Sequence, residues 1–452
     1  MLPNEDTDLI LGNITGPNTG QSVLEGEVAI VKSLKYELGS NATDFRFYRN
    51  ASLIVKTDLI LERRGINSFI SDDNGGELGR LEVGNNMIIG SSNNANTTKS
   101  EIYFGSSGSE TSGGWRPAGN VKIGNDLILY NASAAVFNVG TTKTLEQAST
   151  SNPDIYVGGV INLVPGEGTL SGITPSIYIT HRFGSAAYPY VDPTTTILSS
   201  NGITGNGIIH GGVTSSQYYS KGCIGILHLR NNDVQTFSGW LRDGNDPNIT
   251  DTKLKIIMEG TDAGVQKILG NYSIFTGGVE VRGGTFEIAR YSYSDATITT
   301  DSSASHGNLT MLGGRFKFSP GDGITSAAFG FDKLEYADGI IWLNINQDGA
   351  DMIKLHNGTI TALDDFTGKV FFEFDGNVEL LLDNYVKIVD WTQKSELGNN
   401  NFYADDYGMN KAVFDVRDDG LYVKYSAIPE PATCAAILGI FCLAIAAWRH
   451  RK

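Results

Sequence analysis

Adjacent carboxylates are the side chains of this sequence that are best suited to chemistry on a polysaccharide. Four Asp-Asp pairs occur, at Asp72-Asp73, Asp364-Asp365, Asp405-Asp406 and Asp418-Asp419. Hydrolysis of a glycosidic bond needs two carboxyl groups that flank the same bond. Neighbours in a strand point to opposite faces, and every pair has Asn, Gly, Thr or Tyr within two residues, as a turn would. We therefore predict turns at these pairs and no catalytic residues among them.

Three acidic turns could alternatively bind Ca²⁺, which takes carboxylate and carbonyl oxygens as ligands. They are Asp243-Gly244-Asn245-Asp246, Ser319-Pro320-Gly321-Asp322-Gly323 and Gln347-Asp348-Gly349-Ala350-Asp351. None has the spacing of an EF-hand loop or of the tandem glycine-rich nonapeptide. We interpret them as ordinary Asp-Gly and Asn-Gly turns and predict no metal site.

The sequence also lacks the common motifs of nucleophilic, zinc and phosphate chemistry. It contains no Gly-x-Ser-x-Gly, no Gly-x-x-x-x-Gly-Lys-Ser/Thr and no His-Glu-x-x-His. Only Cys223 lies in the main body, since Cys434 and Cys442 fall in the apolar C-terminal stretch. This count excludes a disulfide framework and a cysteine-rich zinc site from the body. We predict a protein without a cofactor and without enzymatic activity.

Composition excludes nucleic acid as a partner and favours an elongated fold. The formal net charge of -16 repels phosphate backbones. Charged residues make up only 19% of the chain while glycine supplies 55 of its 452 residues, so the chain is polar through Asn, Ser, Thr and Gly. A compact fold of this length would divide into several domains, whereas an elongated repeat fold needs only one.

Hydrophobic residues recur with period two in short bursts, as half-buried strands require. One burst recurs along the first third of the chain, as Thr7-Asp8-Leu9-Ile10-Leu11, Thr57-Asp58-Leu59-Ile60-Leu61, Asn85-Asn86-Met87-Ile88-Ile89 and Asn125-Asp126-Leu127-Ile128-Leu129. Its irregular intervals predict the rungs of a solenoid with loops of varying length between them.

A second repeated unit is a glycine pair followed by alternating residues. It occurs as Gly158-Gly159-Val160-Ile161, Gly277-Gly278-Val279-Glu280-Val281, Gly283-Gly284-Thr285-Phe286-Glu287-Ile288 and Gly313-Gly314-Arg315-Phe316-Lys317-Phe318. Glycine tolerates positive φ, so each pair can turn a corner between strands. The alternation predicts a core of Val279, Val281, Phe286, Ile288, Phe316 and Phe318, and an exposed set of Glu280, Arg282, Glu287, Arg315 and Lys317. A parallel β-helix satisfies this pattern, and a β-sandwich or jelly roll is the alternative.

Residues 331–426 contain longer and more aromatic apolar runs. We expect strands at Ile340–Ile345, Lys369–Phe374, Val378–Leu382, Val386–Trp391 and Gly420–Tyr425. Because an open last rung would pair with other chains, we interpret this segment as final rungs plus a β-rich cap.

The stretch from Thr236 to Ile288 resembles the autotransporter-associated β-strand repeat. The resemblance is carried by Thr236-Phe237-Ser238-Gly239 and by the run from Ile268 to Phe286, in which Ser273 and Phe275 take the usual Asn and Tyr positions and Phe286 takes the place of the final Leu. It covers some 50 residues and implies a right-handed, β-helical, passenger-like stalk. An autotransporter barrel, however, would need many alternating strands at the C-terminus.

The C-terminal end combines Pro429-Glu430-Pro431, an uncharged run from Ala432 to Trp448, and the basic residues Arg449, Arg451 and Lys452. Seventeen helical residues span roughly 25 Å, just enough to cross a bilayer core. Basic residues after the run would keep the extreme C-terminus in the cytoplasm and residues 1–426 outside.

This layout resembles the PEP-CTERM sorting signal of exported bacterial proteins, whose tail is processed by an exosortase. The resemblance implies recognition at Pro429-Glu430-Pro431, transient anchoring through residues 432–448, and a place at the cell surface or in the extracellular matrix, associated with exopolysaccharide. An ordinary C-terminal anchor is the alternative. No N-terminal signal peptide is visible in residues 1–11, which are acidic at their start.

The chain accordingly divides into four expected parts. They are residues 1–225, irregular solenoid rungs; 226–330, β-helix with the autotransporter-associated repeat; 331–426, final rungs and cap; and 427–452, the sorting signal. We expect a non-enzymatic exported surface or matrix protein, and the alternative is a polysaccharide-degrading β-helix enzyme with the same tail.

Overall fold

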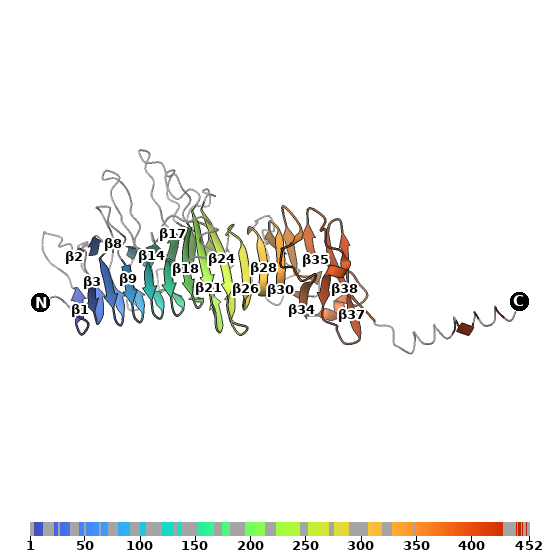
Figure 1. The fold of residues 1–452 in the computed structure, drawn as a ribbon, viewed down its shortest axis with the longest axis horizontal. Helices are drawn as coiled ribbons and strands as arrows, with labels where there is room; N and C mark the ends of the chain where they lie inside the picture. The colour runs from blue at the N-terminus through green and yellow to red at the C-terminus, as the bar shows by residue number, and fades with distance from the viewer. Residues whose placement is uncertain are drawn as a thin grey trace, which may run out of the picture.

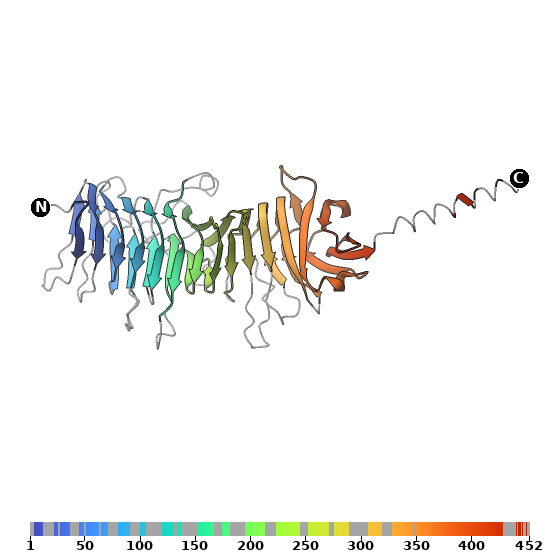
Figure 2. The same ribbon diagram turned by 90° about the horizontal axis from the view of Figure 1, so that it is seen from below.

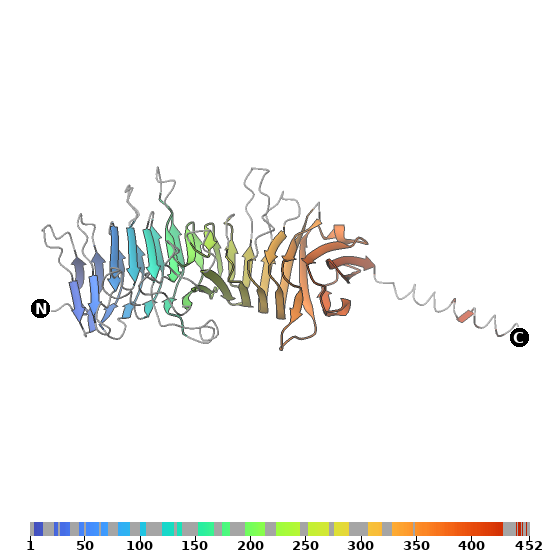
Figure 3. The same ribbon diagram turned by 90° about the horizontal axis from the view of Figure 1, so that it is seen from above.

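The chain winds into a rod of stacked parallel strands, with successive turns side by side along its length (Figure 1). The computed structural model describes residues 4–11, 22–25, 28–36, 45–48, 51–62, 65–70, 80–90, 100–104, 120–130, 133–137, 152–166, 174–180, 195–212, 223–244, 252–270, 275–288, 306–318, 328–346 and 349–427, together with 440, 442, 443, 445 and 449. Views of the rod from below and from above show the same succession of rungs (Figures 2 and 3). The prediction of an all-β parallel solenoid is confirmed, and the sandwich alternative, which needs antiparallel sheets, is wrong.

One side of the rod is a parallel ladder that we call the first ladder. Its strands, in order along the rod, are β3 (Val28–Val31), β6 (Ser52–Val55), β9 (Arg80–Val83), β12 (Val121–Ile123), β15 (Ile155–Val157), β18 (Thr195–Ser200), β21 (Ile224–Leu229), β24 (Lys253–Glu259), β26 (Val279–Gly283), the first parts of β28 (Leu309–Phe318) and β30 (Leu334–Asn346), and β33 (Ile360–Ala362).

A second ladder continues from the first around a tight corner in each rung. Its strands are β1 (Asp8–Leu11), β4 (Ser33–Tyr36), β7 (Leu59–Leu61), β10 (Met87–Ile89), β13 (Leu127–Tyr130), β16 (Ile161–Val164), β19 (Ile203–Gly205), β22 (Val234–Phe237), β25 (Val265–Ile268), β27 (Thr285–Ile288), the second parts of β28 and β30, β34 (Val370–Gly376) and β36 (Phe402–Ala404).

The third side of the rod consists of shorter sheets. They are β2 (Ser22–Glu25) with β5 (Phe45–Tyr48); then β8 (Gly65–Ile70), β11 (Ser100–Phe104), β14 (Ser133–Phe137), β17 (Ser176–Thr180), β20 (Ile208–Gly212) and β23 (Trp240–Arg242); and then β29 (Ala328–Phe331), β32 (Met352–Leu355) and β35 (Val386–Trp391). Side chains from all three sides meet in one hydrophobic core that extends from Val31 to Tyr425.

The repeated bursts seen in the sequence stack on one another in the second ladder. Leu59 of β7 lies opposite Met87 of β10, which lies opposite Leu127 of β13. The first burst, β1, reaches β7 only through β4, a strand that the sequence pattern missed. Leu34 fills the same inward position in β4 and is buried, so one aliphatic residue in register is enough for the core.

The acidic or amide residue at the second position of three of these bursts binds the next rung at the corner. The Oδ1 of Asp58 accepts a hydrogen bond from the backbone N of Asn86 at 3.0 Å, and Asn86 Oδ1 accepts one from Asp126 N at 3.2 Å. Asp126 Oδ1 in turn accepts the backbone N–H of Val160 at 2.9 Å, where the series ends. These side chains satisfy corner amides that the strand ladders leave unpaired.

A buried glutamine side chain replaces a missing strand contact in the second ladder. β19 pairs with β22 only through Gly205 and Phe237, so the ladder leaves the backbone of Ile203 without strand partners on that side. The Oε1 of Gln266 accepts the Ile203 N–H at 2.9 Å, and its Nε2 donates to the Ile203 carbonyl at 3.0 Å. The side chain of Gln266 therefore stands in for a missing backbone pair, which explains why it is fully buried.

The glycine pairs form corners, as predicted. Gly284 separates β26 from β27 with φ of +68°, and Gly314 lies at the bend inside β28 with φ of +61°. A Cβ on Gly314 would come within 2.6 Å of the carbonyl oxygen of Gly284 in the preceding rung. Glycine is thus required both by the left-handed backbone and by the close approach of the two rungs.

The inward positions after these corners are confirmed, but none of the five outward positions is exposed as expected, since Arg282, Arg315 and Lys317 are half-buried and the two glutamates are buried. Phe286 and Ile288 are buried in the core, while Glu287 is only 7% exposed and Glu280 only 8%. Glu287 lies on the outer face between the neighbouring rungs, where the Nζ of Lys267 is 3.3 Å from its carboxylate. The prediction of an exposed Glu287 is wrong because adjacent rungs cover the outer face laterally.

The C-terminal end of the rod changes from parallel to antiparallel pairing. β38 (Gly420–Ala427) pairs antiparallel with β35 on one side and with β37 (Asn410–Arg417) on the other. A short antiparallel pair also joins β31 (Gly349–Ala350) to the end of β30, and a short 3₁₀ helix, η2 (Asn399–Asn401), precedes β36. The hairpin of β37 and β38 therefore covers the edge of the last third-side strand.

One expected strand in this region is a helix. Of the expected strand Val378–Leu382, residues 378–381 form the 3₁₀ helix η1 (Val378–Leu381), and Leu382 makes an isolated parallel bridge with Tyr425. The backbone N–H groups of Leu380 and Leu382 donate to the carbonyls of Asn377 and Glu379. Because a 3₁₀ helix brings positions i and i+3 to one face, Val378 and Leu381 are both buried.

Of the C-terminal stretch, the structure describes Ile440, Cys442, Leu443, Ile445 and Arg449, all of them helical. Within the described residues, no helix combines the length and the apolar character that a membrane span requires.

We predict that the register after the Gly283-Gly284 corner controls stability. Replacing Phe286 by Ala should lower the free energy of unfolding by roughly 3–5 kcal/mol, because the ring is wholly inside the core. Glu287→Gln, one residue away, should cost about 1 kcal/mol or less, since it removes only a partly exposed ion pair. Urea unfolding followed by circular dichroism measures both, and a larger effect at Glu287 than at Phe286 would contradict the register.

Candidate functional site

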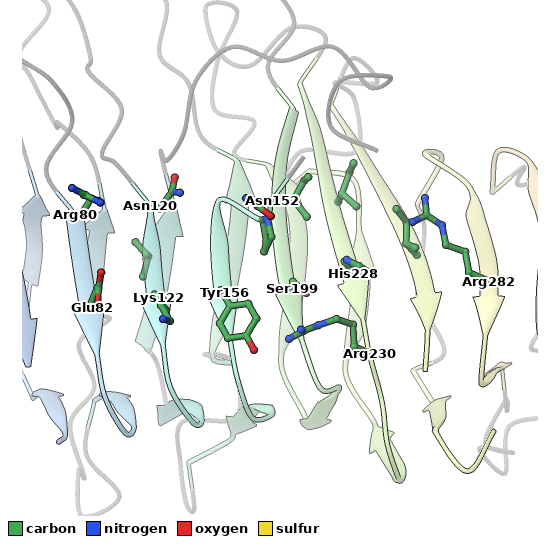
Figure 4. Close-up of a pocket in the computed structure, with 15 residues that line it drawn as sticks. Arg80, Glu82, Asn120, Lys122, Asn152, Tyr156, Ser199, His228, Arg230 and Arg282 are labelled. Carbon is green, nitrogen blue, oxygen red and sulfur yellow. The ribbon is translucent and has the colours of Figure 1, made fainter. Parts of the chain in front are cut away.

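An open groove of about 740 Å³ lies on the outer face of the first ladder. Its lining side chains come from β9, β12, β15, β18, β21, β24 and β26, or from residues directly beside these strands. Figure 4 shows them projecting from the same side of consecutive strands, from Arg80 and Glu82 at one end to Arg282 at the other. The groove therefore runs across the rungs, along the axis of the rod.

The middle of the groove is a single column of residues aligned by the parallel register. From rung to rung this central column is Glu82, Lys122, Tyr156, Ser199, His228, Ile257 and Glu280. Most members stand between two inward apolar residues of their strand, as Lys122 stands between Val121 and Ile123. The alternation that builds the core thus also places the central column outside it.

Arg230 and Tyr156 form a stacked pair in the middle of the groove. The guanidinium carbon of Arg230 lies 4.6 Å from the centroid of the Tyr156 ring, within cation–π range. Arg230 Nη2 donates to the carbonyl of Val157 at 3.4 Å, whereas its buried Nε has no hydrogen-bond partner among the described residues. Figure 4 shows this pair beside Ser199 and His228. The stack holds a cation in a fixed place beside an aromatic face.

Three cations of the groove lack a carboxylate partner. Within the described part of the chain, Arg80, Lys122 and Arg230 form no ion pair. By contrast, Lys255 and Lys267, also on the outer faces of the ladders, each contact a glutamate of the following rung. Among the described residues that line the groove, Glu82 is the one carboxylate, and Glu280, at the end of the central column, is paired with Lys255 and Arg282. The groove is therefore a cationic surface in a chain whose formal net charge is -16.

An ion-pair network closes the C-terminal end of the groove. The Nε2 of His228 lies 2.9 Å from Glu259 Oε2, and Arg282 Nη1 lies 3.4 Å from the same oxygen. Arg282 also donates through Nε to Glu280 at 2.6 Å, while Lys255 Nζ approaches the other Glu280 oxygen at 2.6 Å. The charges of this network are satisfied within the protein, unlike those of Arg80, Lys122 and Arg230.

Burial and charge shift the pKa values of two members of the network. Burial lowers the pKa of His228 below 6.5, and this outweighs the opposing attraction of Glu259. Burial alone would raise the pKa of Glu280, but Lys255 and Arg282 together hold it below its ordinary value of 4.5. At neutral pH, His228 is therefore neutral and Glu280 ionised.

An apolar patch borders the central column. Ile197, Ile226 and Ile257 from consecutive strands pack together as a cluster separate from the main core, with Ile224 against them. All three line the groove. All three isoleucines are buried, so they support the strands from which the groove residues project, and the half-buried ring of Tyr156 is the aromatic surface beside the cations.

The carboxylate pairs considered in the sequence lie away from this groove. Asp364-Asp365, Asp405-Asp406 and Asp418-Asp419 are exposed and belong to turns or loops of the C-terminal region, and Asp72-Asp73 falls outside the described residues. Asp419 contacts Lys387 at 2.7 Å and accepts a hydrogen bond from Tyr422, and Asp418 contacts Lys394 at 2.9 Å. None of the described pairs lies among the groove residues.

The first acidic turn has a structural role. Asp243 Oδ1 accepts the backbone N–H groups of Leu254 and Thr276, each at 2.8 Å, and its Oδ2 accepts the Thr276 hydroxyl at 2.8 Å. Burial raises its pKa, although these three donors oppose the shift. Asn245, Asp246 and the turn 319–323 lie outside the described residues, as do residues 347 and 348. Among the described residues, no three metal-ligating side chains gather at one point.

The residues predicted for sorting remain predictions. Pro429, Glu430, Pro431, Ala432, Trp448, Arg451 and Lys452 lie outside the described residues, and Arg449 is helical and exposed. Sequence reasoning missed the groove itself, although a signal was present. Glu82, Lys122 and Tyr156 each occupy the middle of an apolar–x–apolar triplet, but the triplets are separated by segments of unequal length, so their alignment needed the register.

Comparison with known proteins gives no further guide to the site: no family model matches the chain, and no curated protein matches it either.

We predict a specific pH dependence for the contribution of His228 to stability. Because its folded pKa lies below the ordinary 6.5, the unfolded chain takes up the proton first, and stability falls as the pH drops through 6.5. The difference in unfolding free energy between the wild type and His228→Gln should therefore shrink between pH 7.5 and pH 5.5. Urea unfolding at each pH measures it. A difference that grows on acidification would mean that Glu259 dominates over burial.

Proposed function

We propose that this protein is a non-enzymatic surface or matrix protein whose solenoid binds an extended polysaccharide. The observation that carries the proposal is the groove, which crosses consecutive rungs of the first ladder from Arg80 to Arg282. A linear polymer can lie along such a groove and contact several rungs at once, so weak contacts at each rung combine into useful affinity.

The chemistry of the lining supports a carbohydrate ligand. The exposed side chains of Asn120 and Asn152 offer hydrogen bonds, and the half-buried ring of Tyr156 offers apolar surface. A sugar presents hydroxyl groups at its edge and C–H groups on its faces, so it needs both kinds of contact. Arg230, held over Tyr156, adds donors in a fixed orientation.

Binding without cleavage is favoured over polysaccharide hydrolysis. A glycoside hydrolase needs two carboxyl groups about 5–10 Å apart across one bond. Glu82 is the single carboxylate among the groove residues, and it lies at one end. A polysaccharide-degrading β-helix enzyme is the alternative, because Lys122, Tyr156, His228 and Arg230 include groups that could act in an elimination.

The proposed location rests on the sequence. The resemblance of residues 427–452 to a PEP-CTERM signal supports export, a transient membrane helix over residues 432–448 and processing by an exosortase. The resemblance of Thr236–Ile288 to the autotransporter-associated repeat supports a right-handed β-helix of passenger type. Together the two resemblances favour the cell surface or the extracellular matrix, where exopolysaccharide is an available polymer.

Binding and cleavage can be separated in one experiment. The full chain is incubated with purified exopolysaccharide and with plant and algal polysaccharides, and co-sedimentation, new reducing ends and unsaturated sugar products are all measured. We expect at least one polymer to co-sediment with the protein and no new chain ends to form. Release of reducing ends or unsaturated products would favour the enzyme instead, and no binding to any polymer would contradict the proposal.

The sorting signal makes a second prediction. Replacing Pro429, Glu430 and Pro431 by Ala should block removal of the tail, while Ala432 to Trp448 still inserts, because insertion depends on hydrophobicity and processing on the triplet. The measurement is the mass of the protein released from a host with an exosortase and a functional export signal. Release of the wild type without residues 432–452 is expected. An intact tail in both proteins would indicate an ordinary anchor.

A further inference from the structure

We propose that the groove is selective for an anionic polysaccharide, one that carries carboxylate groups along its length. This inference rests on the proposed function, because it specifies the class of polymer that the same groove binds. It specifies that the ligand is negatively charged, whereas the proposed function does not specify a charge.

The charge balance of the lining carries the inference. Arg80, Lys122 and Arg230 share the described lining with one carboxylate, that of Glu82, and the fourth cation, Arg282, is already paired with Glu259 and Glu280. In a chain with 50 acidic and 34 basic residues, such an excess of cations on one surface runs against the overall composition. A cationic surface within an acidic protein attracts anions locally and repels them elsewhere, so it directs an anionic ligand to that surface.

The state of these cations strengthens the argument. Arg282 is neutralised by Glu259 and Glu280, but Arg80, Lys122 and Arg230 form no ion pair among the described residues. Arg80 and Lys122 are exposed and Arg230 is half-buried, so a ligand carboxylate can approach each of these cations without displacing a carboxylate of the protein.

The length of the groove points to a polymer rather than a small anion. Its lining extends over seven strands of the first ladder, from β9 to β26, which is about 29 Å at the usual strand separation. Arg80 lies one strand before Lys122, and the guanidinium of Arg230 reaches back over Tyr156, one strand beyond Lys122. A chain with a charged group in its repeating unit can meet these cations and continue along the groove.

The uncharged part of the groove fits sugar rings beside those charges. The half-buried ring of Tyr156 lies next to Lys122 and against the Arg230 guanidinium, and the exposed amides of Asn120 and Asn152 belong to the same lining. A nucleic acid would match the cations, but the acidic remainder of the chain would repel its dense phosphates. A carboxylated polysaccharide suits both the cations and the ring.

The test compares two polymers that differ only in charge. Binding of polygalacturonate and of its carboxyl-reduced, neutral form to the full chain is measured by isothermal titration calorimetry at low and at high salt. We expect the polyuronate to bind roughly tenfold or more tightly than the reduced polymer, and its affinity to fall as salt rises.

Matched variants locate the effect. Lys122→Gln with Arg230→Gln should weaken polyuronate binding by roughly tenfold or more. Lys354→Gln with Lys411→Gln removes the same charge from β32 and β37, at cations that also lack an ion pair among the described residues, and should bind as the wild type does. The exposed Lys122 alone, changed to Glu, serves as a second groove variant. Circular dichroism and the melting temperature check that each variant is folded.

The outcomes separate this inference from the function on which it rests. Equal binding of the two polymers would overturn selectivity for charge but keep polysaccharide binding. No binding of either polymer or of any other polysaccharide would overturn both. Equal losses in the two double variants would overturn the placement in the groove, and tighter binding of single-stranded nucleic acid than of polyuronate would overturn the class of ligand.

Discussion

The backbone hydrogen bonds between successive rungs are the constraint on which the rest of this structure depends. Parallel strands bond in register, so every residue lies directly over its counterpart in the neighbouring rung at a separation of about 4.8 Å. A residue is therefore acceptable only if it suits the residues before and after it in its column. Leu34, Leu59, Met87 and Leu127 form one such column inside the core.

Where strand pairing ends, side chains form the hydrogen bonds between rungs. At the corners before the second ladder, Asp58, Asn86 and Asp126 accept the amides of the following rungs. At Ile203, the amide group of Gln266 replaces a strand that does not pair there. These polar residues are buried or half-buried because each completes a hydrogen-bond set that hydrophobic residues would leave open. Specific polar residues are thus as necessary to the rod as its apolar core.

The sequence was informative wherever a residue's neighbours along the chain decided its environment. Repeated Asp-Leu-Ile-Leu bursts and glycine pairs predicted parallel strands and corners, because alternation and positive φ are local properties. It failed where neighbours in adjacent rungs decided. Glu287 is covered by residues from the rungs on either side, and residues 378–381 form a 3₁₀ helix although their apolar content suits a strand. The groove escaped notice for the same reason, since Lys122 and Tyr156 become neighbours only through the register.

Stacking in register also determines how such a surface can change over evolution. The segments between strands vary in length, yet β12, β15, β18 and β21 remain aligned, so the ladder tolerates differences outside it. If one rung between Lys122 and Arg230 were duplicated, the strands would still pair in the same way. The backbone positions of the two residues would move apart by about 4.8 Å. Loss of a rung would bring them together by the same step. The separation of two such positions along the rod therefore changes by whole rungs and not by gradual shifts.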